Sequence, residues 1–335
     1  MPDCQLESTD DGMWWCPVCH RHLQKRGDAA PRRNCLTYKS KRSRGLGDTI
    51  AKVTAAVGIK LCGGCNKRKE ALNRWFPYKG EEAADLTPVH FTTPMDVVYP
   101  LASGRHGRKV LGSNWDDNEL RYSLRSLEEN FPNMGRVYVV TEILPKWLKN
   151  VVHLQAKDVH TRNKDANLID KVLLACRSGV SQTFLRLSDD QCLLQPWDGL
   201  DVWHMGSADV NKRGKWWRRC QRTCSYLKAQ GRPVLYYDCH CPFPVDRDTF
   251  IQVAEAAPYQ EPPGMSINTL YFNSIDIPRV RMNGQKVAFH SPTGPKKIAR
   301  LSEGKMFLGY SERGTNKSMR RFLRRRFPEP SRFES

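Results

Sequence analysis

Apolar positions from about residue 94 onward fall into two alternating kinds of segment. Short apolar runs rich in β-branched residues predict buried strands in "MDVVYP", "GRVYVVTE", "VVHLQAKD" and "QTFLRLS". Between them, "WDDNELRYSLRSLEENFP" has Leu120, Leu124 and Leu127 at helical spacing, and "DANLIDKVLLACRSG" predicts a second helix that ends at Gly179. Strands alternating with helices predict an α/β fold, a largely parallel sheet with helices on both faces, in which ligands gather beyond the carboxyl ends of the strands.

The last of these strands runs directly into two adjacent aspartates, Asp189 and Asp190. A buried carboxylate pair is costly unless a positive charge lies on it, so the pair indicates either a cation site or an exposed strand end that merely turns. At the carboxyl edge of a parallel sheet, two carboxylates can hold Mg²⁺ or Mn²⁺, which neutralise a departing diphosphate. The setting favours a metal and diphosphate site at Asp189 and Asp190.

The first eighty residues carry a different pattern, built on cysteine. The chain has 12 cysteines and no secretory signal, which indicates thiols and metal sites rather than disulfides. Two Cys-x-x-Cys pairs predict a structural Zn²⁺, because the short gap lets both sulfurs reach one ion. The predicted ligands are Cys16, Cys19, Cys62 and Cys65, with Cys4, Cys35, His20 and His22 as competing ligands.

Helical spacing between and after these pairs predicts a small zinc-stapled helical module. Asp48 can cap a helix that Gly58 ends, and a basic helix follows the second pair and stops before Pro77. The predicted organisation is a zinc-binding basic module at 1–80, a linker at 81–93 and a larger catalytic domain at 94–335.

The net charge of the chain indicates what kind of partner it binds. The chain has 54 Lys and Arg against 35 Asp and Glu, a formal charge of +19. Three segments account for the whole excess: residues 1–80, "NKRGKWWRRCQR" at 211–222, and the stretch from Ser311 to the end. Clustering of this kind favours contact with a nucleic-acid backbone over three merely solvated faces. The predicted DNA-binding residues are Lys212, Arg213, Lys215, Trp216, Trp217, Arg218 and Arg219.

No run approaches the length of about 20 apolar residues that a membrane helix needs. The N-terminus "MPDCQLESTDDG" also lacks the basic and apolar regions of a signal peptide. We therefore expect a cytoplasmic protein without a membrane partner, in the host cytoplasm if it is viral.

Several of these blocks occur together in a known family. "NELRYSLRSLEENFPNMGRVYVVTEILPKWLKN" followed by "FLRLSDDQCLL" resembles the core of the Stealth-type sugar-phosphate transferases and related bacteriophage glycosyltransferases. "YYDCHCPFPVDRDTF" is similar to that family's Asp-x-His-x-Pro segment, and "FLRRRFPEPSRFE" resembles the closing segment of the phage members. The resemblance spans about 94–335, and it implies a GT-A-like fold and a UDP-sugar or related nucleotide-sugar donor. "DVVYPLASG" lacks the Trp and Asp of the Stealth opening, which favours the plain glycosyl transfer of the phage branch.

Several further side chains are candidates for the site. Asn118, Glu119 and Arg121 open the first helix, where they can bind donor phosphate or base or can serve as a cap and a surface ion pair. Lys171 can reach the diphosphate or be a solvated helix lysine. His240 can complete the metal shell, act on the acceptor hydroxyl or bond to backbone.

Weaker candidates are His290, as a third metal ligand, and a second zinc site of Cys220, Cys224, Cys239 and Cys241, for which buried free thiols are the commoner explanation.

Together these features predict a metal-dependent glycosyltransferase that acts on hydroxymethylated pyrimidine, with 5-hydroxymethylcytosine as the favoured base, in double-stranded viral DNA. One alternative is a Stealth-like enzyme modifying a polysaccharide, which needs the aspartates but not the clustered charge. The other is a non-catalytic zinc DNA-binding protein, which needs the charge but not the aspartates. The sequence leaves the oligomeric state open.

Overall fold

The chain divides into two compact units, Met1–Glu82 and Ala83–Ser335. The computed structural model describes residues 6–8, 13–15, 22–24, 86–102, 119–161, 163–208, 214–311 and 313–335. In the first unit, β1 (Glu7–Ser8), β2 (Met13–Trp15) and β3 (His22–Gln24) form an antiparallel sheet in the order β1-β2-β3.

Most of the predicted zinc module lies outside the described residues. This is true of the predicted ligands Cys16, Cys19, Cys62 and Cys65, of Cys4, Cys35 and His20, and of both predicted helices. Of the competing ligands only His22 is described, and only as part of the backbone of β3. The zinc site therefore stays a prediction.

A five-stranded sheet forms the centre of the second unit. Its strands are β5 (Met95–Pro100), β6 (Met134–Thr141), β7 (Val152–Gln155), β8 (Thr183–Arg186) and β11 (Phe243–Asp246), in the order β11-β8-β5-β6-β7. Four strands run parallel, and β11 pairs with β8 antiparallel. The predicted mixed α/β sheet is thus confirmed, with β11 as an antiparallel edge strand.

Strand order creates a point at which the chain changes direction across the sheet. From β5 the chain adds β6 and then β7 on one side, and it then returns to place β8 on the other side of β5. Crevices for ligands form beyond the carboxyl ends of parallel strands at such a switch point. The end of β8, which carries the aspartate pair, lies at this edge.

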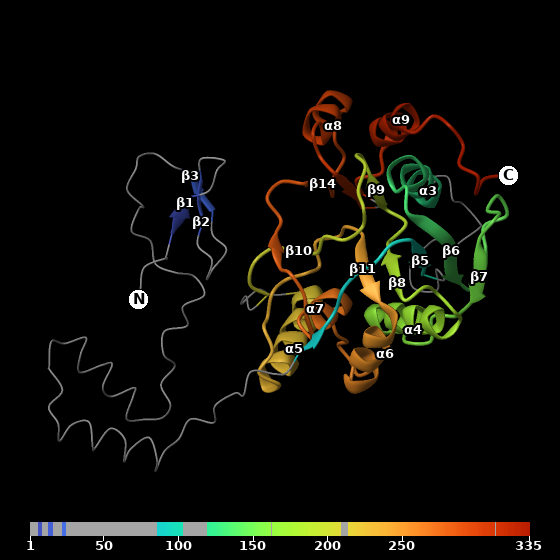
Figure 1. Cartoon of the computed structure of the whole chain (residues 1–335). Coiled ribbons are helices and arrows are strands. Elements are labelled where there is room, and N and C mark those ends of the chain that lie inside the picture. Colours follow the sequence, from blue (N-terminus) through green and yellow to red (C-terminus); the bar gives the residue numbers. More distant parts are fainter. Residues whose placement is uncertain are drawn as a thin grey trace, which may run out of the picture. The chain divides into compact units, whose positions relative to one another are not determined.

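Helices cover both faces of the sheet, which explains why every residue of β5 is buried. Figure 1 shows α3 (Glu119–Asn130), α8 (Pro295–Ser302) and α9 (Lys317–Arg326) on one side. It shows α4 (Lys164–Arg177), α6 (Arg247–Ala256) and α7 (Ile267–Phe272) on the other, next to α5 (Lys215–Ala229). The helices predicted around residues 120 and 170 are confirmed as α3 and α4.

A second, smaller sheet continues from the aspartate pair. Strand β9 (Gln191–Leu193) begins immediately after Asp190 and pairs antiparallel with β15 (Phe307–Tyr310), which pairs in turn with β14 (Lys286–Phe289). The buried side chains of Ile298 on α8 and of Met319 and Leu323 on α9 belong to the same apolar cluster as Leu308 of β15. This sheet therefore joins the turn at the aspartates to helices α8 and α9. Two short pairs, β10 (Trp203–His204) with β13 (Val280–Arg281) and β4 (Thr87–Pro88) with β12 (Ile275–Asp276), complete the sheets of the unit.

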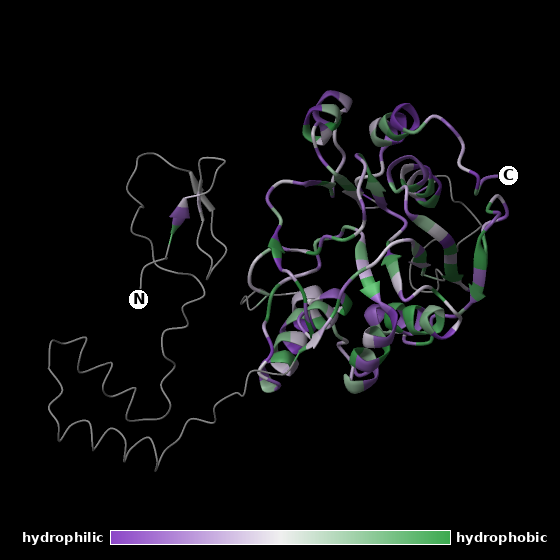
Figure 2. Ribbon diagram, viewed as in Figure 1, coloured by the Kyte–Doolittle hydropathy of each residue, from purple (hydrophilic) through white to green (hydrophobic). Residues whose placement is uncertain are grey.

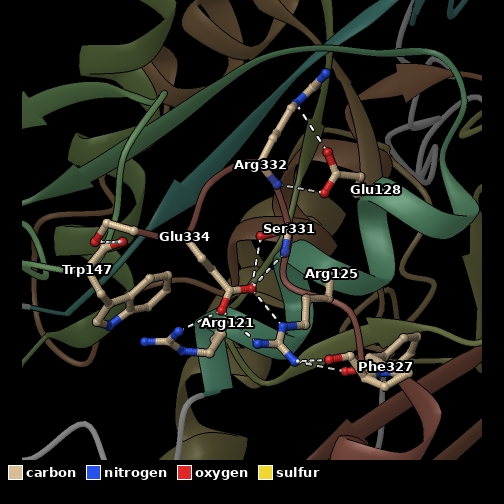
Figure 3. Close-up of polar contacts among 10 residues, drawn as sticks. Arg121, Arg125, Glu128, Trp147, Phe327, Ser331, Arg332 and Glu334 are labelled. Atoms are coloured by element: carbon tan, nitrogen blue, oxygen red, sulfur yellow. Dashed lines mark hydrogen bonds and ion pairs between the residues drawn. The ribbon is translucent and has the colours of Figure 1, made fainter.

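The segment after α9 is fixed to α3 by charge. The carboxylate of Glu334 accepts hydrogen bonds from Arg125 at 2.7 Å and from Arg121 at 2.6 Å, and it also accepts the backbone N–H of Ser331 (Figure 3). The Glu334 side chain is only 3% exposed. Arg332 reaches Glu128, one turn further along α3. We call this set the Glu334 clamp.

Among the described parts of the chain, no helix combines the length and the apolar character needed to cross a membrane.

Candidate active site

The aspartate pair lies on a closed turn between β8 and β9. Strand β8 is fully buried and pairs with β5 on one side, and the N–H of Leu187 still bonds to Val98 O at 3.1 Å. The turn is then closed in both directions, because the N–H of Ser188 donates to Gln191 Oε1 and the N–H of Gln191 donates to Ser188 O. The sheet thereby fixes the two carboxylates at its carboxyl edge.

The two carboxylate oxygens of Asp190 differ in their hydrogen bonding within the described residues. His240 Nε2 lies 2.9 Å from Asp190 Oδ2. The other oxygen, Asp190 Oδ1, is buried and has no hydrogen-bond partner among the described residues. An unsatisfied buried carboxylate oxygen is costly, which indicates that a cation or a donor group belongs beside it.

Asp189 is half-buried next to it, and no described residue forms an ion pair with it. Burial, followed by repulsion from Asp190, raises the pKa of Asp189 to about 6, while Lys164 and His240 act in the opposite direction. Two neighbouring carboxylates repel each other when both are ionised, and a bound divalent cation offsets that repulsion.

The donor set fits a hard cation held jointly with a substrate. Among the described residues, no group of three or more His, Cys, Asp or Glu side chains is arranged to hold a metal ion. Mg²⁺ is commonly held by one or two carboxylates, with substrate phosphates and water completing its octahedron. Asp189 and Asp190 match this mode rather than a site built wholly from protein ligands.

His240 reaches Asp190 from an unusual backbone conformation. Its φ is 54°, in the left-handed region that non-glycine residues seldom occupy. Gly309 of β15 lies against the imidazole, because a Cβ there would be 3.0 Å from His240 Cδ2. Tyr310, the next residue, donates its N–H to Asp190 O at 3.2 Å. Strand β15 therefore packs against both partners of the Asp190–His240 pair.

Lys171 lies at the same edge but is not solvated. Its side chain is 1% exposed, and its Nζ donates to Asp158 Oδ1 at 2.6 Å and to Leu101 O just beyond β5. The alternative of a solvated helix lysine is wrong, because the helix turns this face into the core. The carboxylate of Asp158 already neutralises the ammonium, and contact with a diphosphate stays a prediction.

The three site residues predicted at the start of α3 differ in what the structure describes of them. Asn118 lies outside the described residues. Glu119 accepts a hydrogen bond from Thr315 at 3.1 Å. Arg121 is held by Glu334 and lies 4.3 Å from the centre of the Trp147 ring. Substrate binding by these residues stays a prediction.

Two lysines near the aspartates were not predicted from the sequence. Lys164, exposed at the start of α4, opposes the rise in the pKa of Asp189 that burial and Asp190 cause. Lys286 of β14 donates from Nζ to Cys239 O, beside His240, and burial lowers the pKa of Lys286. The signal for Lys164 was its position at the start of the helix. Nothing local marks Lys286, because its contact spans 47 residues along the chain.

A buried polar cluster lies next to the site, at the end of β8. Arg186 is 5% exposed and donates to Asn268 Oδ1. Asp238 accepts hydrogen bonds from Ser266 and Thr269, and burial raises the pKa of Asp238 despite those bonds. The Asp238 charge in turn opposes the fall in the pKa of Arg186 that burial causes. This cluster fixes the segment that carries His240.

The residues predicted to bind DNA lie largely on α5. Lys212 and Arg213 are outside the described residues, and only the backbone of Lys215 is described. Trp216 donates from Nε1 to the Tyr236 hydroxyl at 3.2 Å, and the Trp217 ring stacks on Tyr236. Arg219 pairs with Asp165 at 2.7 Å, whereas Arg218 is exposed. The role of this run in DNA binding stays a prediction.

The cysteines of the second unit are buried thiols. Cys220 and Cys224 lie one turn apart on α5, and Cys239 neighbours Cys241; each of the four is at most 3% exposed. None of the four forms a disulfide, and no metal-binding group including them occurs in the described residues. His290 is exposed just after β14.

A groove of about 670 Å³ lies along α4, with Asp170, Arg177, Glu255 and Tyr259 among its lining residues. None of the predicted site residues lines it.

No protein-family model and no curated protein sequence matches the chain. Among solved structures, the galactosyltransferase LgtC, in complex with donor and acceptor sugar analogues, superposes on 71% of this chain and 96% of its own, with 12% identity and a TM-score of 0.40. The glycosyltransferase GlyE of Streptococcus pneumoniae TIGR4 superposes on 71% of this chain and 61% of its own, with 10% identity and a TM-score of 0.37. Superpositions this loose assign neither a fold family nor an activity.

Proposed function

We propose that this protein is a glycosyltransferase that moves a sugar from a nucleotide-sugar donor to a hydroxymethylated pyrimidine, 5-hydroxymethylcytosine above all, in double-stranded DNA. The observation that carries the proposal is the buried Oδ1 of Asp190, which has no hydrogen-bond partner in the described ranges, beside the raised-pKa carboxyl of Asp189 at the carboxyl edge of a parallel sheet. A nucleoside diphosphate with a divalent cation is the ligand that satisfies both groups.

Each side chain then has a physical task. Asp189 and Asp190 would hold Mg²⁺ or Mn²⁺, which would offset the charge on the leaving diphosphate. His240 fixes the Asp190 carboxylate through Oδ2, so that Oδ1 keeps one orientation. Lys164, exposed at the start of α4, is close enough for its positive charge to act on Asp189.

The acceptor part of the proposal rests on other features. A net charge of +19 favours a polyanionic acceptor over a neutral one. The hydroxymethyl group supplies the primary hydroxyl that attacks the anomeric carbon. The bond from that carbon to the diphosphate breaks, and the hydroxyl proton passes to the released diphosphate or to water. Flipping of the modified base out of the duplex would bring the hydroxyl to the carboxylates.

Mass spectrometry of nucleosides tests the proposal directly. The full-length protein is incubated with Mn²⁺, a panel of UDP-sugars and DNA containing 5-hydroxymethylcytosine. We expect a mass gain of one sugar that Asp190→Asn lowers at least about 100-fold, because loss of transition-state charge stabilisation costs that much or more. Asp276→Asn, at an exposed strand position, is the matched control and should retain activity.

Two results would contradict the proposal in different ways. Donor hydrolysis without a mass gain on any DNA would move the acceptor to a polysaccharide. DNA binding without donor turnover, unchanged by Asp190→Asn, would indicate a non-catalytic DNA-binding protein.

A further inference from the structure

Helices α8 and α9 pack against each other and carry charge of one sign. Their apolar sides are buried on the small sheet through Ile298, Met319, Leu323 and Phe327. Neither helix contains an acidic residue, and Figure 2 shows hydrophilic bands along both. Their exposed cations, here named the α8–α9 basic face, are Lys296, Lys297, Arg300, Lys317, Arg321, Arg324 and Arg325.

Within the described part of the chain, no carboxylate neutralises these cations. Among the residues that the structure describes, none of the seven forms an ion pair, whereas the neighbouring Arg326 is neutralised by Glu129. Like charges gathered on one surface repel each other, and a polyanion relieves that repulsion by displacing counterions. Arginine predominates on α9, and its planar guanidinium suits phosphate oxygens better than lysine does.

The surroundings of the face favour nucleic acid over a lipid surface. Amphipathic helices that bind membranes insert large apolar side chains beside their basic residues. The exposed large apolar residues of the described chain are Ile143, Val159, Leu200, Met205 and Val280, all of which lie outside α8 and α9. A hydrated face with charge alone matches the phosphate backbone of a duplex.

The same small sheet that supports this face also supports the candidate active site. Strand β9 follows Asp190 directly and pairs with β15, which contacts His240 through Gly309. Helix α9 is further fixed to α3, because Arg326 bonds to Glu129 and Arg125 bonds to Phe327 O. A duplex bound on α8 and α9 would therefore contact helices that pack on the sheet of β9, β15 and β14, whose first strand follows Asp190 directly.

We propose that the α8–α9 basic face is the docking surface for the phosphate backbone of duplex DNA, which it holds as acceptor for the Asp189–Asp190 site. That the bound DNA is the acceptor rests on the proposed function. That DNA docks on this face rests on charge and packing alone. It differs from docking through α5, where Trp216, Trp217 and Arg219 are occupied within the protein.

Fluorescence anisotropy with the full-length protein and a labelled duplex of about 20 base pairs, over a range of salt, tests the docking. Arg321→Glu/Arg325→Glu should weaken binding at least tenfold and lower the salt slope by about 2, because each lost phosphate contact removes about 0.9 from it. Lys146→Glu/Lys149→Glu, exposed between β6 and β7, makes the same charge change and should shift the dissociation constant less than threefold. Lys296→Glu/Lys297→Glu on α8 repeats the test in case the α9 variant does not fold.

Equal weakening by the basic-face and control variants would reduce the effect to net charge, and no weakening by either face variant would overturn the proposal. Binding to vesicles rich in phosphatidylserine, with none to DNA, would reassign the face to a membrane and also overturn it.

Release of UDP from the donor, measured on the same samples, separates the two proposals. Normal release with unchanged DNA affinity in the face variants refutes only the docking surface. Lost DNA affinity in a protein that never releases UDP supports the docking surface and refutes glycosyl transfer.

Discussion

At the scale of single residues, Glu334 shows how a carboxylate fixes a segment of chain. Burial alone would raise its pKa, but hydrogen bonds from Arg125, Ser331 and Arg121 outweigh burial and lower the pKa of Glu334 to about 2. A carboxyl group whose pKa falls on folding stabilises the folded state at pH values above its unfolded pKa. That contribution is present above about pH 4.5 and is lost as the pH falls toward 2.

Glu334→Gln should remove this pH-dependent contribution. We expect the free energy of unfolding at pH 7 to fall by about 3 kcal/mol, since one pKa unit corresponds to about 1.4 kcal/mol. Urea unfolding from pH 7 down to pH 2 measures it, and the difference from the unmodified protein should shrink through this range. Glu303→Gln, at an exposed position after α8, should change little. A constant difference at every pH would contradict the electrostatic origin of the clamp.

At the scale of elements, α4 depends on a buried ion pair for its attachment to the sheet. Lys171 and Asp158 are 1% and 7% exposed, and the ammonium also bonds to the end of β5. Removing one partner of such a pair leaves an uncompensated buried charge, which costs more than the pair itself contributes.

Lys171→Met should therefore destabilise the protein by about 3–5 kcal/mol, and Lys171→Met/Asp158→Leu should recover part of that loss. Chemical denaturation of both variants measures the difference. Lys164→Met, exposed on the same helix, serves as the control. A single variant that loses less than about 1 kcal/mol would show that the ammonium is not needed to compensate Asp158.

The elements that the sequence predicted were those with strong local periodicity. The apolar pattern within each segment was enough to predict strands β5, β6, β7 and β8 and helices α3 and α4. The sheet of β9, β15 and β14 was missed, because its strands have three or four residues and Gly309 pairs with Gln191 from far along the chain. The burial of Lys171 was missed for the same reason, since its partner Asp158 precedes the helix.

The candidate site divides along the same line. Asp189, Asp190 and His240 were predicted from local motifs, and the structure places His240 beside Asp190; their roles stay predictions. The roles of Lys164, Lys286 and Gly309 depend on contacts between distant segments, which periodicity does not encode. The predicted zinc ligands and Asn118 fall outside the described residues and stay predictions.

At the scale of the whole molecule, the chain divides into two compact units. The three clusters of buried apolar side chains found among the described residues all lie within Ala83–Ser335. The first unit contributes basic residues and the predicted zinc site. Catalysis and part of the DNA affinity are thus expected to be separable.

A form containing only residues 83–335 should keep a cooperative thermal transition by circular dichroism, because its interior is intact. We expect it to bind duplex DNA at least about tenfold more weakly than the full chain, since counterion release scales with the number of phosphate contacts. Donor hydrolysis should persist. Unchanged DNA affinity would refute docking by the first unit and leave the α8–α9 basic face as the main surface.

The clamp also bears on how the protein can be handled. Ser335 donates its backbone N–H to Trp147 O at 2.8 Å, directly after the clamped Glu334. A purification tag or an immobilisation linker fused after Ser335 would pull on this contact and, through Arg121 and Arg125, on α3.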